Sequence, residues 1–476
     1  MKSAALISIF VMLLSGCSPH TPVPVTTPAT MPESFANATD KTTETKIIEP
    51  WWQQFNDPEL NSLEETLLTN NLQIKQAYAH LAQIAAASHS ASSSLFPSIN
   101  LNSSATKGRQ KTATTITTSN SQNVSLAAGY EIDLWQKLKS NRESAQLDFA
   151  ASREEIKTLY LTLTCQAADL YFLAIEQRAQ LKLTDAIIES LRIARDQIKF
   201  RYQQGVSTSL ALYQADQSLA TAKTKKPGIE AALATTENAL AVLLGHYPEN
   251  NTLKSTRELP VPPPAPQTGI PTQLLQQRPD VQRAFLQVKS SDAKTAAAVA
   301  DRFPTLNLSG SLGASRTATG LSTIHATFWN LIVGLTQPII DGGRRRAEVD
   351  RRQAVTAEAM ARYQQVVLKA FQEVENALIA NQTAAEQLTL KQMEMATANA
   401  TLRRATDGYN QGLNDYLAVL TAQRQQHEVS HQLITSQRQL LSARITLWRA
   451  LGGDWLETNL NNNLLSQTNE EINHEK

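Results

Sequence analysis

Residues 96–105 read FPSINLNSSA, and residues 303–312 read FPTLNLSGSL. Both stretches alternate apolar or small side chains with polar or small ones, which is the two-residue period of a β-strand. In the first stretch Ile99 and Leu101 alternate with asparagines. The sequence therefore predicts two related strands, each with one apolar face.

These stretches belong to a longer internal repeat. The segment Tyr202-Gln203-Gln204-Gly205 returns as Tyr409-Asn410-Gln411-Gly412, and 409 minus 202 gives the same offset as 303 minus 96, namely 207. A period of this length indicates a duplicated half-domain rather than the short units of a solenoid. We expect repeat 1 over residues 51–258 and repeat 2 over residues 259–456, with a proline-rich joint at residues 260–266.

Each repeat is expected to hold a pair of strands, over about residues 97–131 and about residues 304–340. The further apolar positions of these strands are Val124, Leu126, Ala128, Tyr130, Leu306, Leu308, Leu312, Trp329, Leu331, Val333 and Leu335. Alternation over about ten residues, apolar on one face and small or polar on the other, is what a barrel strand between lipid and water requires. The alternative interpretation is an ordinary half-buried sheet.

Long helical hairpins are expected after each strand pair, over about residues 135–245 and about residues 344–452. The stretch between Trp135 and Phe200 contains no Gly or Pro, and a helix of that length approaches about 100 Å at 1.5 Å per residue. Four strands per chain cannot close a barrel, because about eight is the smallest number that encloses packed side chains. The sequence therefore predicts an oligomer.

The N-terminus reads as an export signal. Residues 1–16 carry Lys2 and an apolar run from Ala4 to Leu14, which is far short of the roughly 20 residues of a membrane span. Leu14-Ser15-Gly16-Cys17 resembles a bacterial lipobox, which implies an S-diacylglycerol and an N-acyl group on Cys17. Ser18 stands where an inner-membrane retention signal would have Asp, which implies transfer to the outer membrane. An ordinary signal peptide with an incidental cysteine is the competing interpretation.

The segments that flank the folded body are rich in polar residues. Residues 17–50 are expected to form a lipidated flexible tether, and residues 457–476 a polar tail without fixed structure.

Cys165 is the only other cysteine, and we interpret it as a small apolar residue on a packed helix face. No stretch after the signal peptide is expected to form a transmembrane helix.

Composition and motifs argue against nucleic-acid binding and catalysis. Lys and Arg number 44 and Asp and Glu 43, a formal net charge of +1, so no bulk positive field recruits nucleic acid. The sequence has no glycine-rich phosphate loop, no Cys-x-x-Cys and no His-Glu-x-x-His motif. We therefore expect no enzyme activity, no metal and no cofactor besides the lipid on Cys17.

Several segments together resemble the TolC-like outer membrane factors, in particular the lipoprotein branch with OprM-like and NodT-like proteins. The resemblance covers about Trp51 to Trp455. The segments that carry it are Leu72 to Leu101, Arg278-Pro279-Asp280-Val281, Phe303-Pro304, Glu131-Ile132-Asp133-Leu134-Trp135, Gln337-Pro338-Ile339-Ile340-Asp341-Gly342-Gly343-Arg344 and Leu451-Gly452-Gly453. One departure is Gln136, where the family usually has Gly, which is expected to alter the turn between strand and helix.

This resemblance implies an α+β membrane protein of the cell outer membrane that is lipid-anchored and extends into the periplasm. Four strands from each protomer of a homotrimer would close a twelve-stranded β-barrel, and the long hairpins would form an α-helical tunnel. The expected function is passive export of drugs or other small solutes within a tripartite efflux pump. The expected partners are a periplasmic adaptor, an inner-membrane transporter of RND, MFS or ABC type, and outer-membrane lipid.

The resemblance also implies roles for residues at the hairpin tips. Tyr202 and Gly205 mark the first tip, Tyr409 and Gly412 the second, and such tips meet the adaptor. Related channels place a Leu and an Asp as constricting rings just beyond the second tip. Here Leu417 fits the first ring, Thr421 replaces the carboxylate of the second, and Asp415 is the nearest acid that would stand in for it.

A pair of histidines and a run of arginines each allow a functional and a purely structural interpretation. His427 and His431 are four residues apart and share a helix face, but no third ligand is near, so an interhelical or solvated pair is the default over a metal site. Arg344-Arg345-Arg346 is expected at the junction of strands and helices, where it would face phospholipid head groups or simply form a solvated helix start.

Three other functions compete with this one. The duct of a type I protein-secretion system is the nearest competitor. A periplasmic coiled-coil adaptor or scaffold lipoprotein would carry one hairpin within a lipoyl-like domain, whereas this chain has two related hairpins. An enzyme acting on the cell envelope would need a nucleophile with its base, or a metal set.

Overall fold

The computed structural model describes residues 18–28, 31–38, 50–248, 258–266, 271–319 and 322–452. The predicted signal peptide, Cys17 and the tail 457–476 lie outside the described residues.

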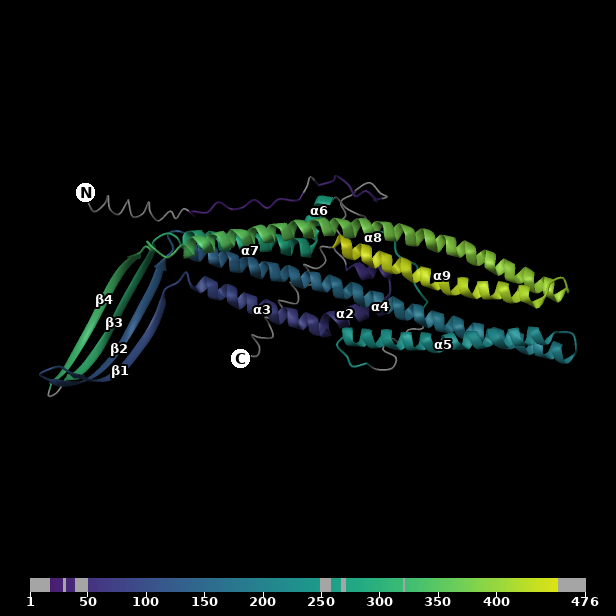
Figure 1. Cartoon of the computed structure of the whole chain (residues 1–476), viewed down its shortest axis with the longest axis horizontal. Helices are drawn as coiled ribbons and strands as arrows, with labels where there is room; N and C mark the ends of the chain where they lie inside the picture. The colour runs from purple at the N-terminus through teal and green to yellow at the C-terminus, as the bar shows by residue number, and fades with distance from the viewer. Residues whose placement is uncertain are drawn as a thin grey trace. The chain divides into compact units, whose positions relative to one another are not determined.

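Apart from η1 at the start of the first half, the two halves have the same order of elements (Figure 1). The first half contains η1 (Trp51–Phe55), α2 (Pro58–Asn70), α3 (Leu72–Ser93), β1 (Ser98–Lys111), β2 (Ile116–Ile132), α4 (Lys137–Gln203) and α5 (Ser209–Leu243). The second half contains α6 (Pro271–Gln277), α7 (Pro279–Ala300), β3 (Thr305–Thr319), β4 (Ser322–Thr336), α8 (Arg344–Asn410) and α9 (Tyr416–Leu451). The first residues of α3, α4, α5 and β1 are separated from those of α7, α8, α9 and β3 by the offset found in the sequence repeat.

The second strand pair is shorter than predicted. Strand β4 ends at Thr336, whereas the sequence suggested strand structure to about residue 340. Pro338 explains the early end, because proline has no N–H to donate to a sheet ladder. Ile339 and Ile340 beyond it are 84% and 92% exposed.

The chain divides into two compact units. The first comprises residues 1–28, 79–154 and 282–366, and the second comprises residues 29–78, 155–281 and 367–476. The four-stranded sheet belongs to the first unit, and the ends of both helical hairpins belong to the second.

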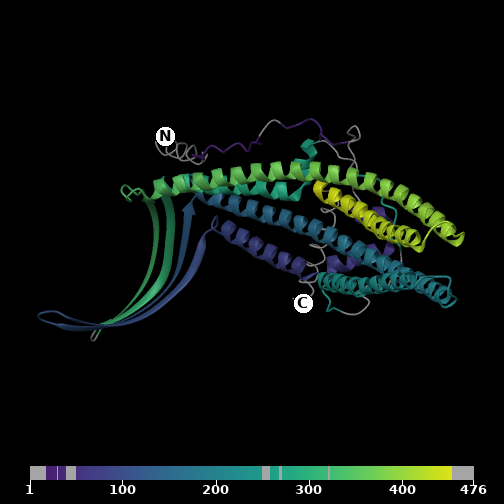
Figure 2. The ribbon, with the colours of Figure 1, turned by 45° about the vertical axis from the view of Figure 1, so that its right-hand side comes forward.

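The sheet is antiparallel in the order β1-β2-β3-β4 and curves along its length (Figure 2). Its register aligns the predicted apolar positions in rows, because paired residues point to the same face. One such row contains Leu101, Leu126, Leu312 and Trp329. The neighbouring row on the opposite face contains Asn100, Ala127, Ser311 and Asn330. The structure therefore confirms one apolar face. The opposite face is small and polar on β1 to β3, whereas on β4 it also carries Ile324, Phe328 and Ile332.

An aromatic cluster forms the centre of the second unit. Trp51 and Phe172 are at most 1% exposed, and the rings of Phe55 and Phe172 have centroids 5.3 Å apart. The Tyr171 hydroxyl donates to Asp57 Oδ2 at 2.9 Å. Asp57 also caps α2 by accepting from the Glu59 N–H. This contact ties the start of the folded body to the middle of α4.

Helix α4 is long and partly apolar. It contains one 18-residue window that is long and apolar enough to cross a membrane, but 61% of that window is buried within the protein. A buried core helix passes the same test of length and composition. Apolarity in α4 is therefore explained by packing.

The segment expected to be a flexible tether has fixed contacts in its described residues 18–28 and 31–38. In the first unit, His20 Nε2 lies 2.8 Å from Asp292 Oδ1 on α7. In the second unit, Phe35 is only 4% exposed, and the Ala36 N–H donates to Glu375 Oε1 at 2.7 Å. Buried aromatic surface and paired carboxylates therefore connect these residues to the helices.

Candidate functional site

Two short turns form the ends of the hairpins and have the same construction. Gly205 and Gly412 have φ angles of 74° and 75°, the left-handed region in which side chains with a Cβ are strained. Three residues after each glycine a side chain caps the next helix: Thr208 accepts from the Ala211 N–H, and Asp415 accepts from the Ala418 N–H. The repeat therefore extends to the local hydrogen bonds of the tips.

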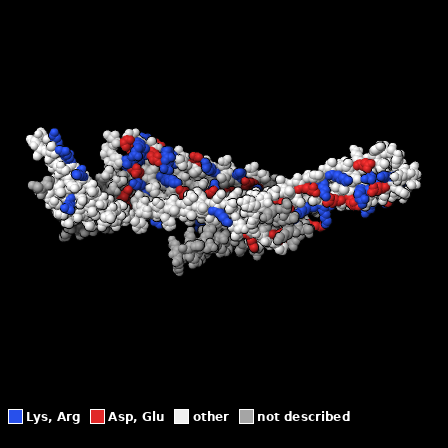
Figure 3. Space-filling view, turned by 90° about the horizontal axis from the view of Figure 1, so that it is seen from below, with Lys and Arg blue, Asp and Glu red and all other residues white. Residues whose placement is uncertain are grey.

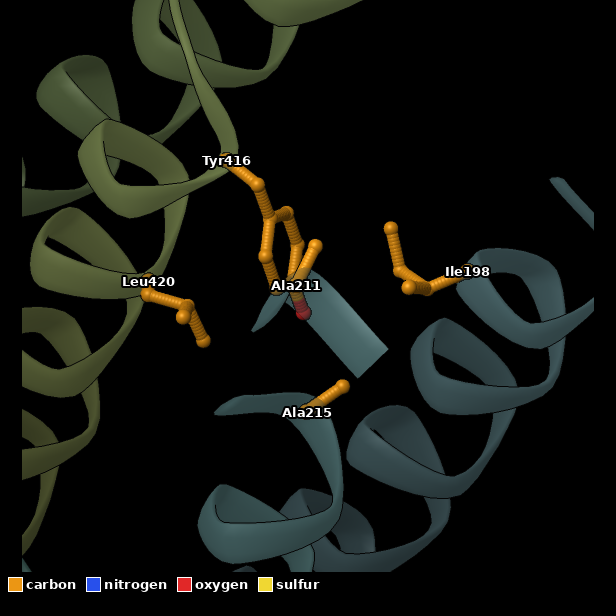
Figure 4. Packing of buried hydrophobic residues seen from close by; sticks show 5 residues of the cluster. All are labelled: Ile198, Ala211, Ala215, Tyr416 and Leu420. Carbon is orange, nitrogen blue, oxygen red and sulfur yellow. The ribbon is translucent and has the colours of Figure 1, made fainter. Parts of the chain in front are cut away.

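The two hairpins meet close to these turns. Ile198 of α4 and Ala211 and Ala215 of α5 pack with Tyr416 and Leu420 of α9 (Figure 4). Tyr416 projects from the first turn of α9 toward the other hairpin, and Leu420 follows one turn later on the same side. Burial of these side chains holds the two hairpin ends together.

The tyrosines of the two tips differ in their surroundings. Tyr202 is 44% exposed, whereas Tyr409 packs against the cluster just described, with its ring centroid 5.7 Å from that of Tyr416. The Arg201 guanidinium lies over the Tyr409 ring, 5.0 Å from its centroid. The first tip therefore offers an exposed aromatic ring, and the second uses its ring for packing.

The predicted gate residues lie on one exposed side of α9. Leu417 is 52% exposed, and Thr421 is exposed one turn later, with its hydroxyl donating to the Leu417 carbonyl at 2.9 Å. Asp415 is exposed as well, but its carboxylate is engaged in capping α9. Tyr416 and Leu420 are buried on the neighbouring face of the helix, which leaves Leu417 exposed. Thr421 also lines the groove between α9 and the other hairpin.

His427 and His431 lie in an interhelical contact. Both line a groove of about 590 Å³ between α4, α5 and α9, together with Lys225 of α5 and Glu428. His431 Nδ1 is hydrogen-bonded to the Gln180 side chain of α4. Burial, with contributions from His431 and Lys225, lowers the pKa of His427 to about 4. Among the described residues no three His, Cys, Asp or Glu side chains gather into a possible metal site.

Ion pairs organise the junction between strands and helices. Arg345 Nε lies 2.9 Å from Asp301 Oδ2, and Lys137 Nζ lies 2.6 Å from Glu131 Oε1. Trp135 stacks on Phe303 at 4.8 Å and donates from Nε1 to the Pro304 carbonyl. Of the three consecutive arginines, Arg345 is therefore structural, and its two neighbours are exposed.

The position of Gln136 also belongs to this junction. Its φ angle is 61°, so it adopts the left-handed conformation without being glycine, and the equivalent residue of the second half is Gly343 with a φ of 82°. The predicted departure from the family pattern is therefore a strained residue at the start of α4.

Comparison with known proteins identifies the family. The family described as outer membrane efflux protein matches residues 63–246 and again residues 270–453, so the two matches repeat at the same offset as the strands and helices. The chain belongs to this family.

The chain is similar to characterised members over nearly its full length. It is 29% identical to the pyoverdine export outer membrane protein OpmQ of Pseudomonas putida over 451 residues, which cover 93% of this chain and 95% of that protein. It is 28% identical to the probable outer membrane lipoprotein SilC of Salmonella typhimurium, with 96% and 99% covered. A solved structure of the outer-membrane channel OprN superposes with a TM-score of 0.83 at 27% identity, covering 92% of this chain and 99% of that chain.

These comparisons confirm the predicted family, location and function. The protein is an outer-membrane channel component of a tripartite efflux pump, and it extends into the periplasm. A transport role rather than an enzymatic one characterises the family.

Sequence reasoning missed the packing partners of the tips. It singled out both tyrosines and both glycines, but not the cap at Thr208, the cation–π partner Arg201 or the buried Tyr416 and Leu420. Thr208 lies one repeat offset before Asp415, so the internal repeat pointed to it as the equivalent residue of the first tip. The contact between hairpins leaves no comparable signal, because it joins residues of different repeats that lie far apart in the chain.

Proposed function

We propose that three copies of this chain close one twelve-stranded barrel and form a passive duct for drugs or other small solutes. An energised inner-membrane transporter of RND, MFS or ABC type supplies the solute through a periplasmic adaptor. A duct of this kind needs no cofactor, and the lipid on Cys17 directs the protein to the outer membrane.

The open edges of the sheet carry this proposal. Among the described residues, strands β1 and β4 each pair on one side only. In lipid an unpaired edge is prohibitively costly, because no water satisfies its N–H and C=O groups. The apolar and polar faces of the sheet match the outside and inside of an aqueous barrel. Four strands require further copies for closure, and three copies supply twelve.

The free sides of the hairpin ends support roles in docking and closure. The tip at Tyr202 and Gly205 presents Val206 at 65% and Leu210 at 65% exposure, which provides apolar surface for an adaptor. The exposed side of α9 provides Leu417 for a constriction at the channel axis. Three leucines that meet on an axis expel water and thereby exclude hydrated ions.

Cysteine pairs placed on the two edge strands test the closure. Leu101→Cys on β1 is combined in turn with a cysteine at Thr327, Trp329, Leu331 or Val333 on β4, which share its face. Within one sheet these positions are at least about 14 Å apart, three strand spacings, and a disulfide spans at most about 7 Å between Cα atoms. Any disulfide therefore joins two chains.

We expect one of these four pairs to give a covalent trimer on oxidation of outer membranes, whereas Leu101→Cys alone gives none. Planar-bilayer recording should show a pore that is mostly closed. Monomers at all four pairs, together with a monomeric mass in detergents that preserve barrels, would refute the trimeric barrel.

A further inference from the structure

The charged residues of the sheet are few and unequally placed. Strands β1 to β4 contain Lys107, Arg109, Lys111 and Arg316 as their basic residues, and Glu131 as their single acidic residue. Glu131 is the penultimate residue of β2 and pairs with Lys137 of α4. The part of the sheet away from the helices therefore carries basic charge and no acidic charge in its described residues. Figure 3 shows basic and no acidic side chains at the strand end of the face in view.

All four basic residues lie on the apolar face. Lys107, Arg109 and Lys111 are separated by even numbers of residues from Leu101, so their side chains point to its side of β1. The ladders continue without a break from the Leu101 row to the turns. Arg316 occupies the same face of β3, four residues after Leu312.

The four side chains are available for binding. Each is exposed, and none forms a salt bridge or side-chain hydrogen bond with another described residue. Successive residues on one face of β1 are about 7 Å apart, so Lys107, Arg109 and Lys111 form a column. Gln122, the pairing partner of Arg316 on β2, is also the partner of Ala105 on β1, so Arg316 lies beside the start of this column.

The order of side chains along this face matches the cross-section of a membrane leaflet. On β1, Leu101 is followed on this face by the small residues Ser103 and Ala105, and these are followed by the basic column. Long basic side chains at the edge of an apolar band keep their aliphatic stems on that band and extend their charges to the head-group level. A ligand that covers both regions must carry hydrocarbon chains and anionic groups.

We infer that Lys107, Arg109, Lys111 and Arg316 form a binding surface for the phosphate groups of a phosphorylated glycolipid of the lipopolysaccharide type. The inference rests on the proposed barrel. Because the helices occupy the periplasm, the turns between β1 and β2 and between β3 and β4 reach the outer leaflet, where such a glycolipid resides. Guanidinium groups bind phosphate through paired N–H donors, and ammonium groups add point charges. The basic column has no acidic neighbour among the described strand residues to compete for them.

Binding of purified diphosphorylated lipid A to the full-length protein in detergent tests the inference. The test variant is K107Q/R109Q/K111Q/R316Q. The control variant K199Q/K223Q/R403Q/R404Q removes two lysines and two arginines from exposed positions on α4, α5 and α8. We expect at least tenfold weaker retention of lipid A by the test variant in native mass spectrometry, and less than a twofold change for the control. A charge-conserving variant, K107R/R109K/K111R/R316K, should retain most of the binding.

Two further arms identify the ligand. Dephosphorylated lipid A should bind the wild-type protein as weakly as diphosphorylated lipid A binds the test variant. Inorganic phosphate at millimolar concentration should not displace the glycolipid, since a free anion lacks the acyl chains.

Equal retention by the test and control variants, or equal binding of the dephosphorylated lipid, would overturn the inference. Channel recording in bilayers of phospholipid alone separates this failure from failure of the barrel. Wild-type protein that forms pores there while showing no charge-dependent glycolipid binding would leave the duct intact and refute only the basic surface.

Discussion

Arg201, near the end of α4, places its guanidinium carbon 5.0 Å from the centre of the Tyr409 ring, near the end of α8. This contact joins the first hairpin to the second beside the apolar cluster at the tips. In the proposed duct, opening of the periplasmic end would separate the hairpin ends, so the Arg201–Tyr409 contact is expected to favour the closed state.

Arg201→Gln is therefore expected to raise the open fraction of the channel. A cation–π contact contributes about 1 kcal/mol. Its loss in one protomer corresponds to a roughly fivefold increase in the ratio of open to closed channel. Single-channel recording measures the open fraction directly. Tyr409→Phe retains an aromatic ring and should behave nearly as wild type, whereas Tyr409→Leu should match Arg201→Gln. An unchanged open fraction in both Arg201→Gln and Tyr409→Leu would contradict a role in closure.

The proposed constriction at Leu417 gives a prediction that separates apolar from electrostatic gating. Leu417→Ser should raise conductance and sensitise cells to large antibiotics such as vancomycin, because a polar side chain lets water remain on the axis. Thr421→Asp should mainly increase cation preference. Asp415→Asn removes the charge but keeps a capping side chain, whereas Asp415→Ala also weakens the start of α9 by about 1 kcal/mol. If Asp415→Asn opens the channel and Leu417→Ser does not, the gate is electrostatic.

Gln136 provides a test of strain at the junction. Gln136→Gly should raise the midpoint of thermal unfolding, because a left-handed conformation costs a residue with a Cβ about 1 kcal/mol or more. Gln136→Ala serves as the control, since it shortens the side chain but keeps the strain, and it should be less stable than Gln136→Gly. The reverse change Gly343→Ala should lower stability, and open space around Gly343 excludes a clash as the cause. A Gln136→Gly protein no more stable than Gln136→Ala would show that the turn is unstrained.

The lowered pKa of His427 predicts that acid destabilises the contact between the hairpins. Its pKa in the folded protein is about 4, mainly because of burial, against about 6.5 in an unfolded chain. Between these values the unfolded chain binds a proton that the folded one does not, so stability is full above about pH 6.5 and falls as the pH drops toward 4. The charged or titratable groups that act on His427 are His431 and Lys225. The Lys225 Nζ atom also lies 3.9 Å from Glu428 Oε2.

His427→Gln should flatten the decline in thermal stability between pH 6.5 and 4, whereas His80→Gln, on an exposed position of α3, should leave it unchanged. Identical pH profiles for His427→Gln and wild type would contradict this assignment.

Lipidation of Cys17 is expected from the lipobox. Cys17→Ala should abolish incorporation of radioactive palmitate, whereas Cys165→Ala should not, because Cys165 is buried against the Ile445 carbonyl. Part of the export activity should survive Cys17→Ala, since the proposed barrel would itself insert in the membrane. Retained palmitate labelling in the Cys17→Ala protein would show that the cysteine is not the acceptor.

The amino-acid sequence alone determined the features that depend on local periodicity. Alternation around Leu101 and Leu308 was sufficient to place the strands, and the constant offset between matching segments was sufficient to show that two halves share one plan. The absence of Gly and Pro after Trp135 predicted α4, and Gly205 and Gly412 predicted the turns, because each of these effects acts within a few residues of backbone.

Only the tertiary structure decided which residues meet across long separations. Tyr202 and Tyr409 are equivalent in sequence, yet one is exposed and the other packs on Tyr416. Phe35 reads as part of a loose tether, yet it is buried against the Phe371 ring. Lys107 and Arg316 join one basic surface solely through the register of β1, β2 and β3. Local pattern specifies which face of an element a residue occupies, but burial and charge depend on which other element covers that face, and that is settled by packing of the whole chain.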